Sequence, residues 1–369
     1  MSVPMLFEPL ALPRGPLLKN RMMLAPMTNW QSHPDGTLSD KEYRWLTMRS
    51  AGGFALTMTA ASHVQPVGQG FGGQIGIFGD EHIEGLTRLA NTIRANGSVS
   101  SVQLHHAGTR AEKAIVRVPV GPSDHAESGA RGLSGAEVET LRDDFIAAAK
   151  RAERAGFDGV EVHGAHGYIL AEFLSTETNR RDDRYGGSLE NRARIIFEII
   201  DGIRATTRPD FQVGLRLSPE RFGLKLAEIR DVAAEVLRAA QIDYLDMSLW
   251  DVAKEPAEPE HRGRSLMSYF TELPRGNVRL TAAGKVMSAK SAAGVIEAGC
   301  DFVVVGRAAI LRHDFPERVR RDHDYTSPAL PISVEHLREE GLSDEFIQYM
   351  RQFKGFVEDE EPAHAAPEV

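Results

Sequence analysis

The sequence predicts a (β/α)8 barrel of the TIM-barrel class, with long loops at its catalytic face and a short helical extension at the C-terminus. Eight strand-like segments are present, and most of them are followed by an amphipathic helical pattern. Several helices end in a glycine that leads directly into the next strand, as at Ala155-Gly156 and Ala298-Gly299. No Gly-x-Gly-x-x-Gly follows the first strand, and no Pro- or Ser-rich linker divides the 369 residues. Together these features favour one closed barrel over an open, doubly wound sheet.

The expected strands follow one another at intervals that leave room for a helix. In chain order they are Met22–Ala25, Phe54–Thr59, Val99–Leu104, Phe157–His163, Phe211–Leu217, Ile242–Ser248, Asn277–Thr281 and Asp301–Gly306. The amphipathic runs between them include Leu141–Arg154, Arg192–Ala205, Ala227–Ala240 and Ser288–Ala298.

Three connections are longer than a barrel needs, and each follows a strand: Gly108–Gly135, Asn179–Asn191 and Leu249–Arg264. Such loops shape pockets at the catalytic face of a barrel. We expect the barrel to span residues 1–325 and a helical extension to span 326–357, with capped helices at Ser333–Glu340 and Ser343–Gln352. The acidic, Ala- and Pro-containing residues 358–369 are expected to form a disordered tail.

The composition narrows the classes of partner. A net charge of -9 and a pI near 5.8 argue against nucleic acid or an anionic membrane, and no apolar run approaches the ~20 residues of a membrane span. Cys300 is the only cysteine, which excludes an intrachain disulfide and a cysteine-ligated metal cluster. The N-terminal residues lack the basic region and apolar core of a signal peptide. We therefore expect a cytoplasmic protein with small-molecule ligands.

A cluster of hydrogen-bonding side chains closes the fourth expected strand, in His163-Gly-Ala-His166-Gly-Tyr168. Function gathers at the C-terminal ends of strands in parallel α/β folds, so the cluster is a candidate site. Three interpretations compete on the residues alone. The two imidazoles can bind a metal, they can be structural and satisfied by backbone carbonyls, or they can polarise a substrate oxygen while Tyr168 supplies a proton.

The seventh and eighth strands end in a pattern typical of phosphate binding. Thr281-Ala-Ala283-Gly284 closes one and Val303-Val-Val-Gly306-Arg307 closes the other. Barrels often hold phosphate on the backbone N–H groups after these two strands, and an arginine adds a bidentate contact. The alternative is that the glycines only permit tight turns and Arg307 is a surface charge.

Polar side chains also stand at the ends of three further strands. Gln103 and Arg216 suit a polar heterocycle, although Arg216 can instead form an internal ion pair, for instance with Glu161. Thr28 follows the first strand and Trp30 comes two residues later. In isolation, Thr28 can equally be a helix cap and Trp30 a packing residue.

With these residues in order, the chain resembles the Old Yellow Enzyme family of flavin-dependent ene-reductases from about Leu6 to Arg320. Five motifs carry the resemblance: Asn20-Arg21 through Ala-Pro-Met-Thr28; Gln103-Leu-His-His-Ala-Gly108; His163-Gly-Ala-His166-Gly-Tyr168 running into Glu172-Phe-Leu-Ser; Asn179 through Arg192; and Val-Val-Gly306-Arg307.

The resemblance implies non-covalent FMN at the mouth of the barrel and NADPH or NADH as hydride donor. It assigns the flavin ring and ribityl chain to Pro26, Met27, Thr28, Ala61, Gln103 and Arg216, and the phosphate to Ala283, Gly284, Gly306 and Arg307. His163 and His166 match the pair that binds the substrate's carbonyl or nitro oxygen, Tyr168 matches the proton donor, and Trp30 falls at a substrate-lining position. The expected reaction delivers hydride to the β-carbon of an activated alkene, with protonation at the α-carbon.

The resemblance also bears on the alternatives and on assembly. A metal at His163 and His166 is not expected, because the neighbouring strand ends offer Gln103, Arg216 and Ser248 rather than a set of carboxylates. The nearest candidate for a further ligand is Asp246. Two other functions stay open: an FMN-binding barrel without catalysis, and a metal-dependent hydrolase that uses the His-x-x-His pair. A homo-oligomer is expected, in which Arg338, Arg351, Phe353 and Phe356 of the extension reach a neighbouring subunit's site.

Overall fold

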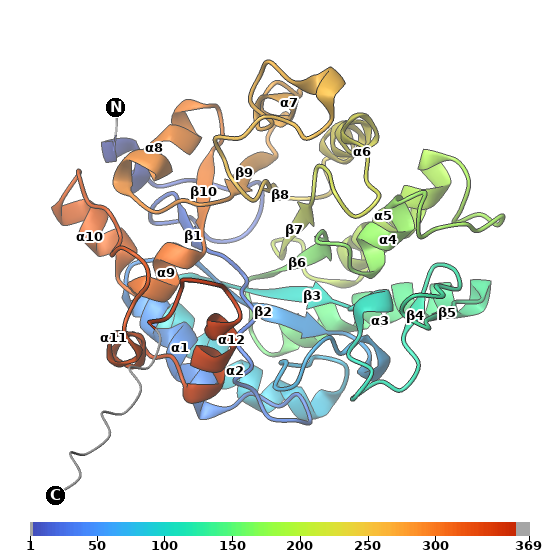
Figure 1. The fold of residues 1–369 in the computed structure, drawn as a ribbon, viewed down its shortest axis with the longest axis horizontal. Helices are drawn as coiled ribbons and strands as arrows, with labels where there is room; N and C mark the ends of the chain where they lie inside the picture. The colour runs from blue at the N-terminus through green and yellow to red at the C-terminus, as the bar shows by residue number, and fades with distance from the viewer. Residues whose placement is uncertain (1–2, 359–369) are drawn as a thin grey trace, which may run out of the picture.

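A closed barrel of eight parallel strands forms the centre of the molecule (Figure 1). The computed structural model describes residues 3–358. Around the barrel the strands run in the order β1-β10-β9-β8-β7-β6-β3-β2, and every neighbouring pair is parallel. Their bounds are β1 (Met22–Leu24), β2 (Leu56–His63), β3 (Val99–His105), β6 (Gly159–Gly164), β7 (Gln212–Leu217), β8 (Tyr244–Ser248), β9 (Arg279–Ala283) and β10 (Phe302–Val305).

The predicted fold class and all eight predicted strands are confirmed, with shifts of a few residues at their ends. The largest shift is in β2, which continues to His63 instead of stopping at Thr59. An irregularity between Met58 and Ala61 shifts the register against β3, after which pairing resumes with Ala61 opposite Gln103. A β-bulge cannot be foreseen from alternation alone, because it interrupts the alternation on which the prediction rests.

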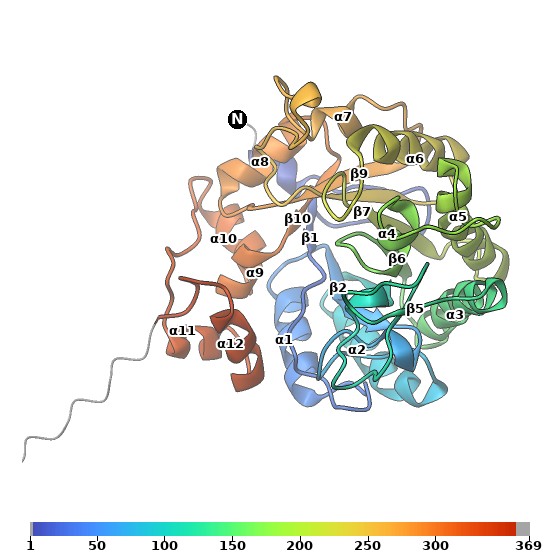
Figure 2. The same ribbon diagram turned by 45° about the vertical axis from the view of Figure 1, so that its right-hand side comes forward.

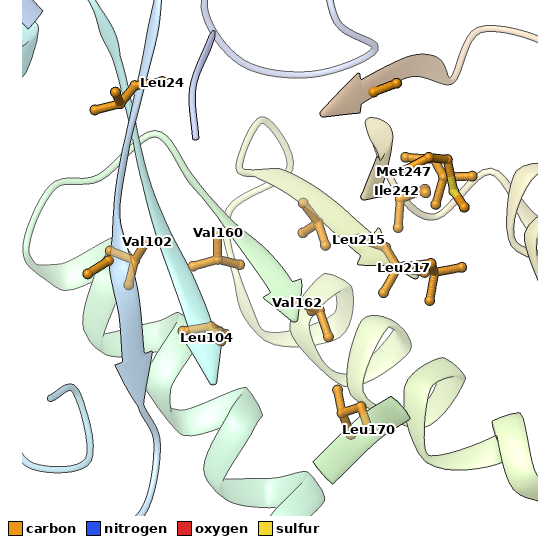
Figure 3. Packing of buried hydrophobic residues seen from close by; sticks show 14 of the residues in the cluster. Leu24, Val102, Leu104, Val160, Val162, Leu170, Leu215, Leu217, Ile242 and Met247 are labelled. Carbon is orange, nitrogen blue, oxygen red and sulfur yellow. The ribbon is translucent and has the colours of Figure 1, made fainter. Parts of the chain in front are cut away.

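Side chains alternate between two hydrophobic layers along the strands. Outward residues such as Val102, Val160 and Leu215 pack under the surrounding helices, and Figure 3 shows part of this layer. Inward residues such as Met23 and Phe302 form a second, smaller cluster. This period of two is that of a strand buried on both faces. It also decides which residues at the strand ends face the mouth of the barrel.

Helices surround the barrel on its outside (Figure 1). The four helices that the sequence predicted are present as α3, α5, α6 and α8. In the described part of the chain the α-helices are α1 (Asp40–Ala51), α2 (Ile83–Ala95), α3 (Gly135–Arg154), α4 (Ile169–Leu174), α5 (Leu189–Thr206), α6 (Leu226–Ala239), α7 (Ser268–Thr271), α8 (Ala289–Glu297), α9 (Arg307–Leu311), α10 (Phe315–Arg321), α11 (Val334–Glu339) and α12 (Asp344–Arg351).

Short elements lie within the long loops and in the extension. The loop after β3 contains the two-stranded pair β4 (Val120–Gly121) and β5 (Arg131–Gly132). The two predicted C-terminal helices are α11 and α12, and their N-caps are Ser333 and Ser343, as the sequence indicated. The predicted tail lies almost entirely outside the described residues. Within residues 3–358, no helix is both long and apolar enough to cross a membrane.

Candidate active site

Polar side chains occupy inward positions at the C-terminal ends of four neighbouring strands. Gln103 on β3 is in register with Glu161 on β6, and His163 on β6 is in register with Arg216 on β7. Arg216 is in turn in register with Asp246 on β8, and all five side chains are buried. Barrel interiors are normally filled by branched apolar residues. A polar layer at this level therefore indicates a ligand site at the mouth of the barrel.

This layer opens into a pocket of about 470 Å³, within the range of small-molecule sites. An adjoining cavity of about 270 Å³ shares six residues with it: Pro26, Met27, His166, Arg216, Trp250 and Arg307. Of the residues predicted from sequence, the larger pocket is lined by Pro26, Met27, Thr28, Ala61, Gln103, His163, His166, Tyr168, Arg216 and Arg307, and the smaller one adds Ala283, Gly284 and Gly306. Of the predicted set, only Trp30 lines neither space.

A turn after β6 folds His166 back over His163. His166 and Gly167 both adopt positive φ, at 62° and 69°. Gly167 is required here, since a Cβ would lie 2.7 Å from the ring of Phe222. The turn brings His163 Nε2 to 2.9 Å from His166 Nδ1 and leaves the ring of Tyr168 5.2 Å from that of His163. The three residues of the predicted catalytic cluster are thus side by side.

Both imidazoles are neutral at physiological pH. Burial lowers the pKa of His163 well below its ordinary value, and His166 lowers it further. Burial is also the main cause of the lowered pKa of His166, followed by the positive charge of Arg216. A neutral imidazole carries one N–H and one lone pair. The pair can therefore donate hydrogen bonds to a ligand oxygen without placing a charge in the pocket.

Two carboxyl groups beneath the pocket contact the polar side chains that line it. Gln103 donates from Nε2 to Glu161 Oε1 at 2.7 Å, and Arg216 Nε lies 3.1 Å from Asp246 Oδ2. The sequence suggested Glu161 as the ion-pair partner of Arg216, but Asp246 takes that place. Burial, together with the nearby Asp246, raises the pKa of Glu161 to about 8. Glu161 is thus mainly protonated, and the charge of Arg216 is balanced by Asp246 alone.

The smaller cavity combines an unpaired cation with an uncrowded glycine. Arg307 is exposed, and no acidic side chain in the described chain forms an ion pair with it, whereas Lys285 beside it pairs with Asp251 at 3.0 Å. A Cβ on Gly306 would meet its nearest neighbours, Ala25 and Met27, only at 3.6 Å or more. Packing therefore does not demand glycine at position 306. Because Gly306 has no side chain, its backbone is open to the smaller cavity.

Gly284 differs from Gly306 in this respect. Its φ is 156°, and a Cβ would lie 2.6 Å from the backbone nitrogen of Asp251. Close approach of the loop after β8 therefore explains this glycine without any ligand.

Comparison with known proteins agrees with this geometry. The model of the NADH:flavin oxidoreductase / NADH oxidase family matches residues 5–325, which is most of the chain. The chain belongs to this family.

A relative and two solved structures show the extent of the similarity. The probable NADH-dependent flavin oxidoreductase YqiG of Bacillus subtilis (strain 168) is 37% identical over 331 residues, which cover 86% of this chain and 88% of that protein. Morphinone reductase in complex with tetrahydroNAD matches with a TM-score of 0.76 at 29% identity, over 92% of this chain and 96% of that one. The old yellow enzyme homologue from Zymomonas mobilis matches with a TM-score of 0.78 at 25% identity, over 92% and 99%.

As a member of the NADH:flavin oxidoreductase (Old Yellow Enzyme) family, the protein is an NAD(P)H-dependent flavin oxidoreductase. The resemblance drawn from the five sequence motifs is confirmed.

Helix α12 supplies a wall of the pocket that the sequence did not predict. Tyr349, Met350 and Phe353 from this segment all line it. Figure 2 shows α11 and α12 beside α9 and α1, and the ring of Phe346 packs edge-on against Trp45 at 5.4 Å. The expected contact of the extension with a neighbouring subunit's site stays a prediction; within this chain, α12 contributes to its own subunit's pocket. Of these residues only Phe353, just after α12, was singled out from the sequence, and then for a neighbouring subunit's site. A short helix carries no sign of what it packs against.

Trp30 has a different place from the one expected. Its ring packs against Tyr349 at a centroid distance of 5.1 Å, and it borders a separate groove of about 880 Å³. Tyr349 lines the pocket instead, and its hydroxyl is hydrogen-bonded to Thr28. Burial is the main cause of the raised pKa of Tyr349. The segment after β1 is therefore joined to α12 at the edge of the pocket.

Other pocket residues lie beside predicted ones and were missed. His105 is next but one to Gln103 and faces the same side of its strand. Trp250 follows β8 and contacts His166 edge-on at 6.2 Å, while the Arg110 guanidinium lies 4.9 Å from the ring of Tyr168. The strand alternation was a sufficient signal for His105. Arg110 ends a three-residue 3-10 helix (Gly108–Arg110) and Trp250 lies in a loop, and neither segment has a periodicity that indicates direction.

Proposed function

We propose that the protein binds FMN non-covalently and uses NADPH or NADH to reduce the C=C bond of an α,β-unsaturated carbonyl or nitro compound. The observation that carries this proposal is the meeting of His163, His166 and Tyr168 with Gln103 and Arg216 around one pocket. When bound, FMN accepts hydride from the nicotinamide and delivers it to the β-carbon of the alkene. The chain itself binds, orients and protonates.

The residues around the pocket fit this cofactor. The amide of Gln103 and the guanidinium of Arg216 are anchored from behind and suit a heterocycle with carbonyl groups and ring nitrogens. Pro26, Met27, Thr28 and Ala61 would contact the ring and ribityl chain from the side of β1 and β2. Ala283, Gly284, Gly306 and Arg307 would hold the phosphate, with Arg307 supplying the unpaired positive charge.

The phosphate assignment can be tested separately from activity. Arg307→Ala removes the cation and Gly306→Asp places a carboxylate where the backbone must approach the ligand, so both should lower the FMN content of the purified protein. Gly294→Asp adds the same side chain to α8 at another glycine with open space around it, and should leave the FMN content unchanged. Full flavin retention in both of the first two variants would defeat the assignment.

The substrate end of the pocket divides into two roles. Neutral His163 and His166 would donate hydrogen bonds to the carbonyl or nitro oxygen and stabilise the negative charge that builds on it. Tyr168 would give its phenolic proton to the α-carbon. None of the described residues that line the pocket is acidic, and the Asp246 carboxylate behind it is paired with Arg216.

The hydrolase alternative does not fit the arrangement of the imidazoles. A catalytic metal needs three ligand atoms that converge on one point. His163 instead turns Nδ1 to His105 and Nε2 to His166, so the three rings lie in series. Within residues 3–358, the only grouping of potential ligand atoms is Glu258, Glu260 and His261, outside the pocket.

A screen of cyclic enones, maleimides and nitroalkenes with each nicotinamide donor tests the reductase proposal against the remaining alternative, FMN binding without catalysis. Consumption of NADPH or NADH that depends on at least one of these alkenes is expected. Flavin that is present but unreactive toward all of them would favour the alternative. We further propose that the protein is a homo-oligomer, which sedimentation velocity would test.

A further inference from the structure

His105 is a third imidazole in the pocket, and none of the roles proposed above uses it. It ends β3, is about 1% exposed, and its Nδ1 lies 2.9 Å from Nδ1 of His163. The ring of Tyr168 meets it edge-on at a centroid distance of 4.4 Å. It therefore contacts two of the three residues to which we assign the chemistry.

The three histidines form one chain of hydrogen bonds that ends on a serine. His105 Nδ1 meets His163 Nδ1 at 2.9 Å, His163 Nε2 meets His166 Nδ1 at 2.9 Å, and His166 Nε2 meets Ser248 Oγ at 2.7 Å. Each neutral ring has one N–H, and each of these contacts needs one donor and one acceptor. Only two arrangements satisfy this count: all protons point toward Ser248, or all point toward His105.

The two arrangements leave different groups at the ends of the chain. If the protons point toward His105, its proton moves to Nε2, and no residue in the described part of the chain is hydrogen-bonded to that nitrogen. There it finds no acceptor among the described residues and meets only the open space of the pocket. If the protons point toward Ser248, the chain ends on a hydroxyl oxygen that can rotate to accept. The positive charge of Arg216, which would oppose protons at that end, is balanced by Asp246.

We propose that His105 is a positioning residue that donates from Nδ1 to His163 and thereby holds His163 as its Nε2–H tautomer. Nδ1 of His163 is covered by His105, so only Nε2 can reach a ligand oxygen that His166 also contacts. A ligand oxygen needs an N–H at Nε2 of His163. His105 keeps the proton on Nε2 because it already donates its own N–H to Nδ1. Both the choice of tautomer and the effect on ligand binding rest on the proposed function, but the tautomer can be measured without it.

The tautomer can be observed directly in the holoenzyme. Protein labelled with ¹⁵N-histidine gives distinct NMR shifts for protonated and bare ring nitrogens, and His163→Gln identifies the signals of His163. We expect Nε2–H on His163 with and without bound p-cresol. His105→Phe removes the donor and should give a mixture of tautomers. His105→Asn keeps an N–H near the position of Nδ1 and should restore Nε2–H.

Binding of p-cresol gives a second readout. His105→Phe should weaken it by roughly tenfold, the scale of one hydrogen bond, and His105→Asn should recover most of the affinity. A proton on Nδ1 of His163 in the wild-type holoenzyme, or unchanged p-cresol affinity in His105→Phe, would overturn the role of His105. Nε2–H on His163 without any binding of p-cresol would instead count against the proposed substrate site and leave the tautomer assignment standing.

Discussion

Glu172 should make the stability of the protein fall as pH rises through neutrality. Its side chain joins α4 to the loop after β3, where Thr109 donates to Oε1 from its backbone nitrogen at 2.9 Å and from its hydroxyl at 2.6 Å. Oε2 is buried and has no hydrogen-bond partner in the described chain. Burial raises the pKa of Glu172 to about 8, although the bonds from Thr109 oppose the shift. The folded protein therefore holds a carboxylic acid here at neutral pH.

The size of the effect follows from the pKa values. Between pH 4.5 and 8, Glu172 binds a proton in the folded state but not in the unfolded state, so the free energy of unfolding falls with rising pH across this window. At about 1.4 kcal/mol per pH unit, the loss from pH 5 to pH 8 is about 3–4 kcal/mol. An unfolding entropy of about 2 cal/mol/K per residue converts this loss into about 4–5 °C in Tm for a chain of this length.

The assay compares Tm between pH 5 and pH 8 for wild-type protein and Glu172→Gln, each with saturating FMN. All other titrating groups act equally in both proteins, so the difference between the two Tm curves isolates Glu172. The wild type should lose about 4–5 °C more than the variant. Glu177→Gln, an exposed change in the same segment, should run parallel to wild type. Parallel curves for wild type and Glu172→Gln would show that Glu172 is not a buried carboxylic acid.

Three further predictions concern the pocket. Thr28→Ala should shift the flavin potential and slow reduction by NAD(P)H, by the equivalent of the about 0.5–1.5 kcal/mol of one hydrogen bond. Tyr349→Phe removes only the hydroxyl that is hydrogen-bonded to Thr28. An equal shift in both variants would assign the effect to the Thr28–Tyr349 hydrogen bond. Tyr168→Phe should leave p-cresol binding and reduction by NADPH nearly intact. It should slow re-oxidation of the flavin by an enone more than re-oxidation by a nitroalkene, because the nitronate product can take its proton from water. A wild-type rate of re-oxidation by the enone in rapid mixing would contradict this. Deleting the chain after Thr326 should impair activity, because α12 and its pocket residues are lost. It should also reduce the number of subunits per particle in sedimentation; an unchanged number of subunits would refute a role for the extension in assembly.

Much of this fold could be predicted because each strand is short, buried on both faces and bounded by glycines or helix patterns. The same alternation indicated which strand-end residues face inward, so Gln103, His163 and Arg216 were correctly assigned to one pocket. The order of strands around the barrel then followed from the fold class. The alternation of residues along a strand was sufficient to predict contacts wherever the barrel fold determines which strands are neighbours.

Prediction failed where contacts depend on the path of an irregular segment. Glu161 was named as a partner of Arg216 and Asp246 was missed, because both are inward residues of strands that neighbour β7. Trp30 was expected on the pocket wall. Its backbone instead has a positive φ of 58°, and its ring packs against Tyr349 of α12, more than 300 residues away in the sequence. Neither the backbone angle nor the docking of α12 leaves a trace in the sequence near Trp30.

Anaerobic re-oxidation of the NADPH-reduced holoenzyme by 2-cyclohexenone tests the central claim most directly. NADPH should bleach the visible flavin absorbance, and the enone should then restore it at a rate that rises with enone concentration, with cyclohexanone as the product. Combined replacement of His163 and His166 by alanine should abolish that restoration while a dye oxidant still recovers the flavin. Restoration by enone at the wild-type rate in the double variant would contradict the site, and reduced flavin that no enone, maleimide or nitroalkene re-oxidises would contradict the proposed reaction.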